Sequence, residues 1–219
     1  MSGDQQLEER SKREPTSAST VGLLGGELCL DFANTVEPRL GEHRSDYLAS
    51  YADLVRWARH AGSLSEEEAR RLLLEAGRKP SEAMAAWERA VELRERIYRI
   101  FSAVAYGEEP EASDLETLTA THRKALAHYR IVRTTEGFGW DPVEGDELER
   151  PLWLVALSAT GLLTSGKLQR VKACPAGEGG CGWLFYDASK NMSRRWCSME
   201  GCGSRAKMRR LYARKRDRP

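Results

Sequence analysis

The chain has 219 residues, 41% of them hydrophobic, and a formal net charge of +1 from 34 basic and 33 acidic side chains. This length allows one medium-sized domain with a substantial core and a small second module. No run of about eighteen apolar residues occurs, which argues against a membrane-spanning helix. Residues 1–20 mix charges with Ser and Thr, so we predict a disordered leader with no secretory signal, and a cytoplasmic location.

Residues 21–166 have the pattern of a helical domain. Ser50, Ser65 and Ser113 each precede an acidic residue by three positions, the capping-box arrangement that begins a helix. We predict helices over 50–61, 65–76, 81–106, 113–127 and 146–165, of which 81–106 has the wide apolar arc of a central core helix. Alternating β-branched residues in 128–134, followed by 136–140, predict a small hairpin.

Four of the five cysteines lie near the C-terminus, as the pairs Cys174/Cys181 and Cys197/Cys202. Two pairs separated by a hairpin-length spacer can bring four thiolates to one tetrahedral centre, which predicts a structural Zn²⁺. The six residues inside the first pair exceed the usual two to four, so an iron site, a redox dithiol and non-ligating cysteines remain alternatives. The fifth, Cys29, is expected to be a small buried hydrophobe.

The cysteine-rich segment, residues 167–219, is predicted to form a hairpin followed by a helix. Residues 168–173 and 182–187 are expected to be strands, and Gly179, Gly180 and Gly182 should turn the backbone with N–H groups facing sulfur. From Ser204 onward the pattern is helical, with Met208, Leu211 and Tyr212 on one arc that would dock on the zinc core. The fold class is therefore mainly α, a helical N-terminal domain with a small β-hairpin plus a C-terminal treble-clef-like zinc finger.

The charge is divided unevenly along the chain. Residues 167–219 carry 14 basic and 4 acidic side chains, a formal +10, and the remainder carries 20 basic and 29 acidic, a formal −9. A basic end on an acidic body suggests a polyanion partner, whereas the alternative is a tail that docks on its own body. We expect a chain ending near Lys167 to stay folded and to lose nucleic-acid binding. The candidate nucleic-acid contacts are Arg194, Arg195, Arg205, Lys207, Arg209, Arg210 and Arg214.

Within that set, Arg205 is the candidate for a base edge, because it stands at the start of the predicted helix, and the others are candidate phosphate contacts. Two tryptophans in the same region, Trp183 and Trp196, are expected to pack in the finger core. Exposed rings that stack on unpaired bases are the alternative for both.

Several of these residues carry a family resemblance. Cys181-Gly-Trp-Leu-Phe-Tyr-Asp187, Ser193-Arg-Arg-Trp-Cys-Ser-Met199 and Cys202-Gly-Ser-Arg205 resemble the CGNR zinc finger. Gly25-Gly-Glu-Leu-Cys-Leu-Asp-Phe-Ala-Asn-Thr35, Asp53-Leu-Val-Arg-Trp-Ala58 and Leu93-Arg-Glu95 resemble the ABATE domain that precedes it. The resemblance implies a bacterial, stress-induced transcription regulator whose finger binds double-stranded DNA. Ser204 replaces the family's asparagine; both residues cap helices, so we expect the fold to be kept and base specificity to be affected.

Other functions stay open. An RNA-binding module or a protein-interaction module would show the same zinc and charge, whereas the chain contains no nucleophile elbow, phosphate loop or open metal position, so we expect no enzyme. Asp31, Asn34 and Thr35 could line a pocket for a small-molecule effector, or could cap helices and complete buried hydrogen-bond networks. A homodimer through the apolar segment 152–163 is one arrangement, and simple core burial of that segment is the other.

Overall fold

A computed structural model describes residues 16–39, 44–143, 145 and 147–216. The helices are α2 Leu28–Ala33, α3 Tyr51–His60, α4 Glu66–Arg78, α5 Pro80–Tyr106, α6 Ala112–Leu126, α7 Arg150–Thr164 and α8 Ser204–Arg216. Antiparallel strand pairs join β1 Val36–Glu37 to β2 Ser45–Asp46, β3 Tyr129–Thr134 to β4 Gly137–Pro142, and β5 Val171–Ala173 to β6 Leu184–Tyr186. The mainly α fold with small hairpins is confirmed.

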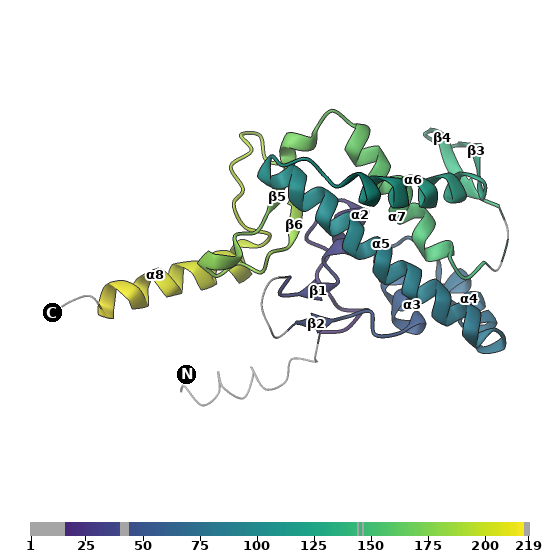
Figure 1. Cartoon of the computed structure of the whole chain (residues 1–219), viewed down its shortest axis with the longest axis horizontal. Helices are drawn as coiled ribbons and strands as arrows, with labels where there is room; N and C mark the ends of the chain where they lie inside the picture. Colours follow the sequence, from purple (N-terminus) through teal and green to yellow (C-terminus); the bar gives the residue numbers. More distant parts are fainter. Residues whose placement is uncertain (1–15, 40–43, 144, 146, 217–219) are drawn as a thin grey trace.

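Helix α5 forms the axis of the body, as the wide apolar arc predicts. It crosses the molecule diagonally, with α6 and α7 along one side and α3 and α4 near its lower end (Figure 1). Ala90, Leu93, Ile97, Ile100 and Phe101 of α5 are all buried. Other helices of the body pack against α5 on several sides. The same helix also contacts β5 and β6 in the cysteine-rich segment, so it links the two parts of the chain.

The N-termini of three helices can be compared with the three predicted capping boxes. At α4 the box is complete, because Ser65 Oγ accepts from Glu68 N at 3.2 Å and Glu68 Oε2 accepts from Ser65 N at 2.7 Å. At α3, Ser50 caps Asp53 N, but the Asp53 carboxylate accepts from the Ser50 hydroxyl instead of the backbone. The prediction at Ser113 is wrong. Helix α6 begins at Ala112 without a side-chain cap.

The acid near the start of α6 is used in a different way. Asp114 is buried and accepts from the guanidinium groups of Arg96 and Arg99 on α5 at 2.7–2.9 Å. These hydrogen bonds, Arg99 first, hold the pKa of Asp114 below its usual range. Tertiary pairing with α5 therefore fixes the N-terminal end of α6 where we expected local capping.

The N-terminal segment is more ordered than predicted where it is described. Residues 1–15 of the predicted leader lie outside the described residues. Residues 17–21 form a turn in which Thr20 N and Val21 N donate to Ser17 O, and Ala18 and Val21 are buried. The leader thus ends earlier than residue 20, because two apolar side chains in its last part join the core.

Helix α2 was not predicted, because six residues are too few to show a helical period. Its Cys29, Leu30, Phe32 and Ala33 are buried, so Cys29 is the buried small hydrophobe that we expected. Burial raises the pKa of the Cys29 thiol to about 12. Within the described residues, no helix is long and apolar enough to cross a membrane.

Candidate metal centre

Cys174, Cys181, Cys197 and Cys202 lie close together, as the sequence predicts for a metal centre. Their Sγ atoms all lie within 4.8 Å of one another, with 3.4 Å between Cys181 and Cys197 and 3.6 Å between Cys197 and Cys202. Sulfurs bound tetrahedrally to one zinc at about 2.3 Å would lie about 3.8 Å apart, whereas a disulfide would bring two of them to about 2.05 Å. All four are buried, free cysteines. The donor set therefore fits one tetrahedral metal ion.

Glycines shape the loop that carries Cys174 and Cys181 between β5 and β6. Gly179 and Gly182 have φ of +104° and +77°, a region that favours glycine. A Cβ on Gly180 would lie 2.7 Å from Cys174 Sγ, so only glycine fits beside that sulfur. The expected N–H groups facing sulfur are not what this loop shows, because Gly180 N and Gly182 N donate to the carbonyl oxygens of Pro175 and Cys174.

The second cysteine pair leads into α8 without a break. Met199–Gly203 forms a π-helical turn that contains Cys202 and continues into α8 at Ser204. The helical cap is Ser198, whose side chain accepts from Gly201 N at 3.1 Å. Ser204 lies inside the helical run, where its hydroxyl donates to Met199 O at 3.2 Å. The prediction that Ser204 acts as an N-cap is wrong.

Arg205, predicted to approach a base edge, instead contacts the metal centre. Its Nη2 lies 2.9 Å from Cys202 Sγ, and its side chain is 55% exposed. This hydrogen bond raises the pKa of the guanidinium further. A cation that donates to a ligating sulfur neutralises part of the charge of a four-thiolate site and orients its ligand.

We therefore expect Arg205→Ala to weaken zinc affinity by about tenfold or more, because partners of metal ligands typically contribute 10–100-fold to affinity. Competition with a chromophoric chelator measures this affinity. Lys207→Ala is the matched control, since Lys207 is a neighbouring exposed cation and should leave zinc affinity unchanged. Unchanged zinc affinity in Arg205→Ala, together with lost selectivity between DNA sequences, would restore the base-reading role.

A second group of residues joins the cysteine-rich segment to the body. Asn34, after α2, is fully buried and pairs with Leu184 of β6 through both ends of its amide: Nδ2 donates to Leu184 O at 2.8 Å and Oδ1 accepts from Leu184 N at 2.9 Å. Thr35 donates to Phe32 O at 2.8 Å. Asp31 accepts from Gly25 N at 2.7 Å, and burial raises its pKa to about 6. The contacts of these three residues are thus buried hydrogen-bond networks, the alternative that we gave to an effector pocket.

Further hydrogen bonds tie the cysteine loop itself to the body. Trp183 Nε1 donates to Val36 O at 2.8 Å, Tyr98 of α5 donates to Gly182 O at 3.0 Å, and Arg39 N donates to Cys181 O at 2.8 Å. Trp183 and Trp196 are 4% and 5% exposed, which confirms their core placement. The buried apolar residues of the body and of the finger form one continuous cluster.

The buried ion pairs that lie next to the contact between the body and the cysteine loop were not predicted from the sequence. Arg94 of α5 donates to both carboxylate oxygens of Asp46 at 2.7 Å, and Arg39 pairs with Glu95 at 2.7 Å. Arg39 and Arg94 have side chains only 2–3% exposed. The motif Leu93-Arg-Glu95, which carried the family resemblance, was the available signal, because adjacent opposite charges in an apolar helix indicate buried partners.

Two basic residues expected at a nucleic-acid surface serve the finger internally. Arg194 lies over the Phe185 ring at 4.5 Å and donates to the carbonyl oxygens of Trp196 and Leu24 at 3.0 and 3.3 Å, so the structure removes it from the candidate phosphate contacts. Arg195 remains exposed, but it pairs with Glu178 and lies over Trp196. Both hold the segment between β6 and the second cysteine pair.

Asp187 closes the same segment. It is fully buried and accepts from Lys172 Nζ at 2.7 Å, Ser189 Oγ at 2.6 Å and Arg194 N at 3.0 Å. Burial alone would raise the pKa of Asp187, but these hydrogen bonds hold it well below its usual range. The charges of Asp187 and Lys172 are therefore paired within the finger.

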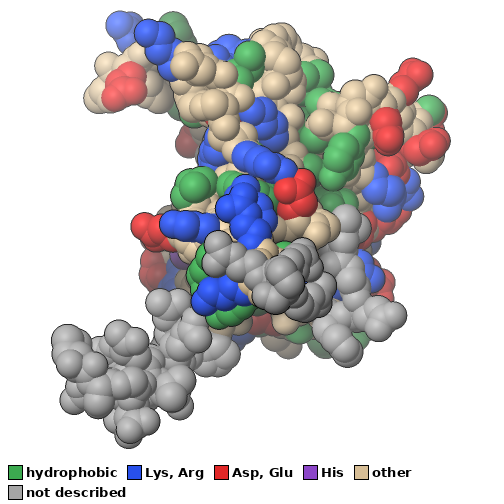
Figure 2. Space-filling view, turned by 90° about the vertical axis from the view of Figure 1, so that its left-hand side faces the viewer, with side chains coloured by type: hydrophobic (Ala, Val, Ile, Leu, Met, Phe, Trp, Pro, Cys, Tyr) green, Lys and Arg blue, Asp and Glu red, His purple; other side chains and the backbone are tan. Residues whose placement is uncertain are grey.

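Helix α8 is the exposed basic element. It extends away from the rest of the molecule (Figure 1), and Lys and Arg side chains gather on the face of the molecule at this end (Figure 2). Seven of its thirteen residues are basic and none is acidic. Among the described residues, no acidic side chain pairs with Lys207, Arg209 or Arg214.

The apolar arc of α8 does not pack as predicted. Met208, Leu211 and Tyr212 are 45%, 47% and 62% exposed. The residue that docks on the metal centre is Ala206, 2% exposed, whose backbone faces Gly179. The prediction that the three larger side chains cover the zinc core is wrong, because α8 leaves the finger after its first turn.

Comparison with known families agrees with this organisation. The family ABATE, described as "Putative stress-induced transcription regulator", matches residues 26–166. The chain belongs to the ABATE family. A CGNR zinc finger matches residues 170–215 of this ABATE protein, which include all four clustered cysteines and nearly all of α8. No curated protein matches the chain.

Proposed function

We propose that this ABATE protein is a zinc-dependent, DNA-binding transcription regulator. The observation that carries the proposal is α8, an exposed helix with seven basic and no acidic residues, fixed at its first turn to a metal centre. Thirteen residues give a helix about 20 Å long. The major groove of B-DNA, about 12 Å wide, accommodates such a helix, and its phosphates pair with lysine and arginine.

Zinc is the metal that we propose for the four thiolates. Cys₄ sites in small modules are typically tetrahedral zinc sites, and all four positions here come from the protein, so the ion has a structural role. Bound zinc would neutralise part of the thiolate charge and hold the β5–β6 loop against the start of α8. Arg205 and the glycine at position 180 complete its surroundings.

Duplex DNA is favoured over RNA by two features. The major groove of an RNA duplex is too narrow for a helix such as α8, and recognition of unpaired RNA depends on exposed aromatic rings. Trp183 and Trp196 are buried, so Tyr212 supplies the exposed aromatic ring of α8. A basic helix with one exposed ring offers no row of aromatic side chains for successive unpaired bases, so it is suited to double-stranded DNA.

The test is a selection from random duplex DNA by the zinc-loaded full chain, with an equimolar pool of random RNA in a parallel arm. We expect enrichment of DNA duplexes that share a short motif, and weaker retention of RNA. Preferential retention of RNA would favour the RNA-binding alternative, and retention of neither pool would favour a protein-interaction finger.

A further inference from the structure

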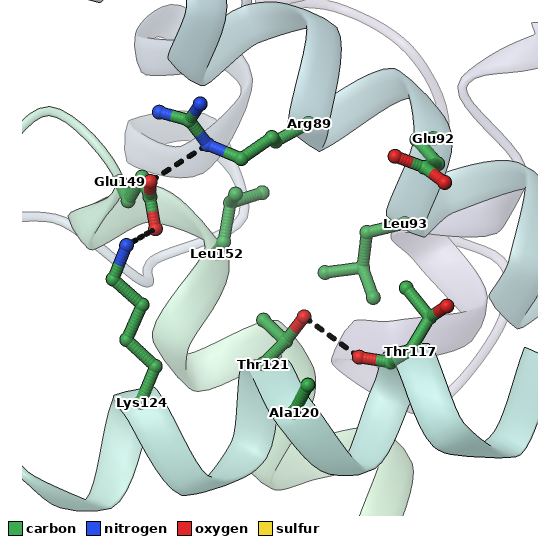
Figure 3. Close-up of a pocket in the computed structure, with 9 residues that line it drawn as sticks. All are labelled: Arg89, Glu92, Leu93, Thr117, Ala120, Thr121, Lys124, Glu149 and Leu152. Atoms are coloured by element: carbon green, nitrogen blue, oxygen red, sulfur yellow. Dashed lines mark hydrogen bonds and ion pairs between the residues drawn. The ribbon is translucent and has the colours of Figure 1, made fainter.

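A groove lies between α5, α6 and the start of α7 (Figure 3). It encloses about 200 Å³, with Leu93, Ala120 and Leu152 as its apolar surface and Thr117 and Thr121 on the α6 side. A second hollow of about 390 Å³ continues beyond Arg89, Lys124 and Glu149, which line both. These three charged residues thus stand where the two hollows meet.

A carboxylate is already held at this point. Arg89 Nε from α5 lies 2.7 Å from Glu149 Oε1, and Lys124 Nζ from α6 lies 2.5 Å from Glu149 Oε2. The Glu149 side chain is 14% exposed, whereas those of Arg89 and Lys124 are 51% and 55% exposed. Two cations from different helices therefore converge on one carboxyl group, and they remain accessible from solvent.

Glu149 balances one of the two positive charges of Arg89 and Lys124, and Glu82 and Glu147 line the second hollow. Glu92 stands at the opposite rim, one turn along α5 from Arg89 (Figure 3), but Arg96 neutralises it with an ion pair of 2.7 Å. Among the described residues, Glu149 is the acidic partner of Arg89. If Glu149 turned away, the groove would present two positive charges above an apolar surface.

We propose that this groove binds a small organic acid. The ligand's carboxylate takes the place of Glu149 between Arg89 and Lys124, and its apolar part lies against Leu93 and Leu152. Glu149 acts as an internal competitor that occupies the cations when no ligand is bound. Guanidinium groups suit this task because they present several donors to a carboxylate.

The groove is connected to the metal centre through α5. Two residues after Leu93 on α5, Glu95 pairs with Arg39, whose backbone N donates to Cys181 O. Tyr98, further along the same helix, donates to Gly182 O. An acid bound in the groove is thus placed to act as an effector of the finger. The effector role rests on the proposed function. Binding of the acid is measured without DNA, so an experiment can reject the effector role and the binding of the acid separately.

The experiment uses benzoate as the probe and the zinc-loaded full chain, followed by amide chemical shifts in two-dimensional NMR. We expect saturable shifts that are largest in α5, α6 and the start of α7, with millimolar affinity, and none with benzyl alcohol, which lacks the charge. Equal shifts with both compounds, or no saturable shift with up to about 50 mM benzoate, would overturn the proposal.

Two substitutions should move the affinity in opposite directions. Arg89→Gln is expected to weaken benzoate binding about tenfold, because it removes a charge-assisted contact. Glu149→Gln is expected to tighten it about two- to fivefold, because the internal competitor is removed. Arg56→Gln, an equal charge change at an exposed site on α3, is the control and should change nothing. Weaker binding in Glu149→Gln, or an effect of Arg56→Gln as large as that of Arg89→Gln, would contradict the site.

Discussion

Cys181→Ala is expected to destabilise the helical body as well as the finger. Loss of one ligand should abolish tight zinc binding and lower the free energy of unfolding by about 5 kcal/mol or more, since metal-binding energy in such modules is folding energy. The effect should reach the body because Asn34, Val36 and Tyr98 lose ordered partners in Leu184, Trp183 and Gly182. Hydrogen exchange of the α5 amides, measured with and without zinc, reports on the body directly.

Cys29→Ala is the matched control, because Cys29 is equally buried but belongs to α2 and lies outside the metal centre. It should keep full zinc content and cost only about 1 kcal/mol, the loss expected from a small cavity. Unchanged exchange protection of α5 in zinc-free Cys181→Ala would contradict a shared core. It would support instead the separable finger that the sequence predicts.

Replacing four of the exposed cations of α8 is expected to have the second largest effect. The variant changes Lys207, Arg209, Arg210 and Arg214 to alanine. At low salt its affinity for duplex DNA should fall by about two orders of magnitude or more for all sequences alike, because each lost phosphate contact lowers the salt slope by about 0.9. Thermal stability should be nearly unchanged, since all four side chains are exposed. Fluorescence anisotropy of a labelled duplex at several salt concentrations measures the effect.

The control for that variant removes the same charge from the body, at the exposed cations Arg56, Arg70, Arg78 and Arg133. Its DNA affinity should remain close to that of the unchanged chain. Equal losses in both variants would mean that net charge alone attracts DNA. In that case α8 would have no special role in binding.

The metal centre was predictable because the residues that determine it are close together in the sequence. Four cysteines within twenty-nine positions leave few ways to arrange the loop, and glycines next to Cys181 allow the tight turn. The long amphipathic pattern of α5 and the complete capping box at Ser65 were predictable for the same reason. Where a neighbouring residue determines the structure, the sequence predicts it.

The predictions fail where the structure depends on contacts between residues that are far apart in the sequence. Asn34 and Leu184 are 150 positions apart, and no periodicity relates them. Arg194 has the composition of a nucleic-acid surface, but its guanidinium lies over the Phe185 ring and donates to Leu24 O, 170 positions away. Met208, Leu211 and Tyr212 do form one arc, yet α8 departs from the finger and no core lies beneath them. Helical spacing predicts which residues share a face, but it does not predict whether another element covers that face.

The salt dependence of duplex DNA binding by the zinc-loaded full chain tests the central claim most directly. Four exposed phosphate contacts on α8 predict that the logarithm of the association constant falls linearly with the logarithm of salt concentration, with a slope of about −3.6. Removal of zinc should abolish this binding, because the ion holds the start of α8. A slope near zero, or equal affinity before and after zinc removal, would contradict the account.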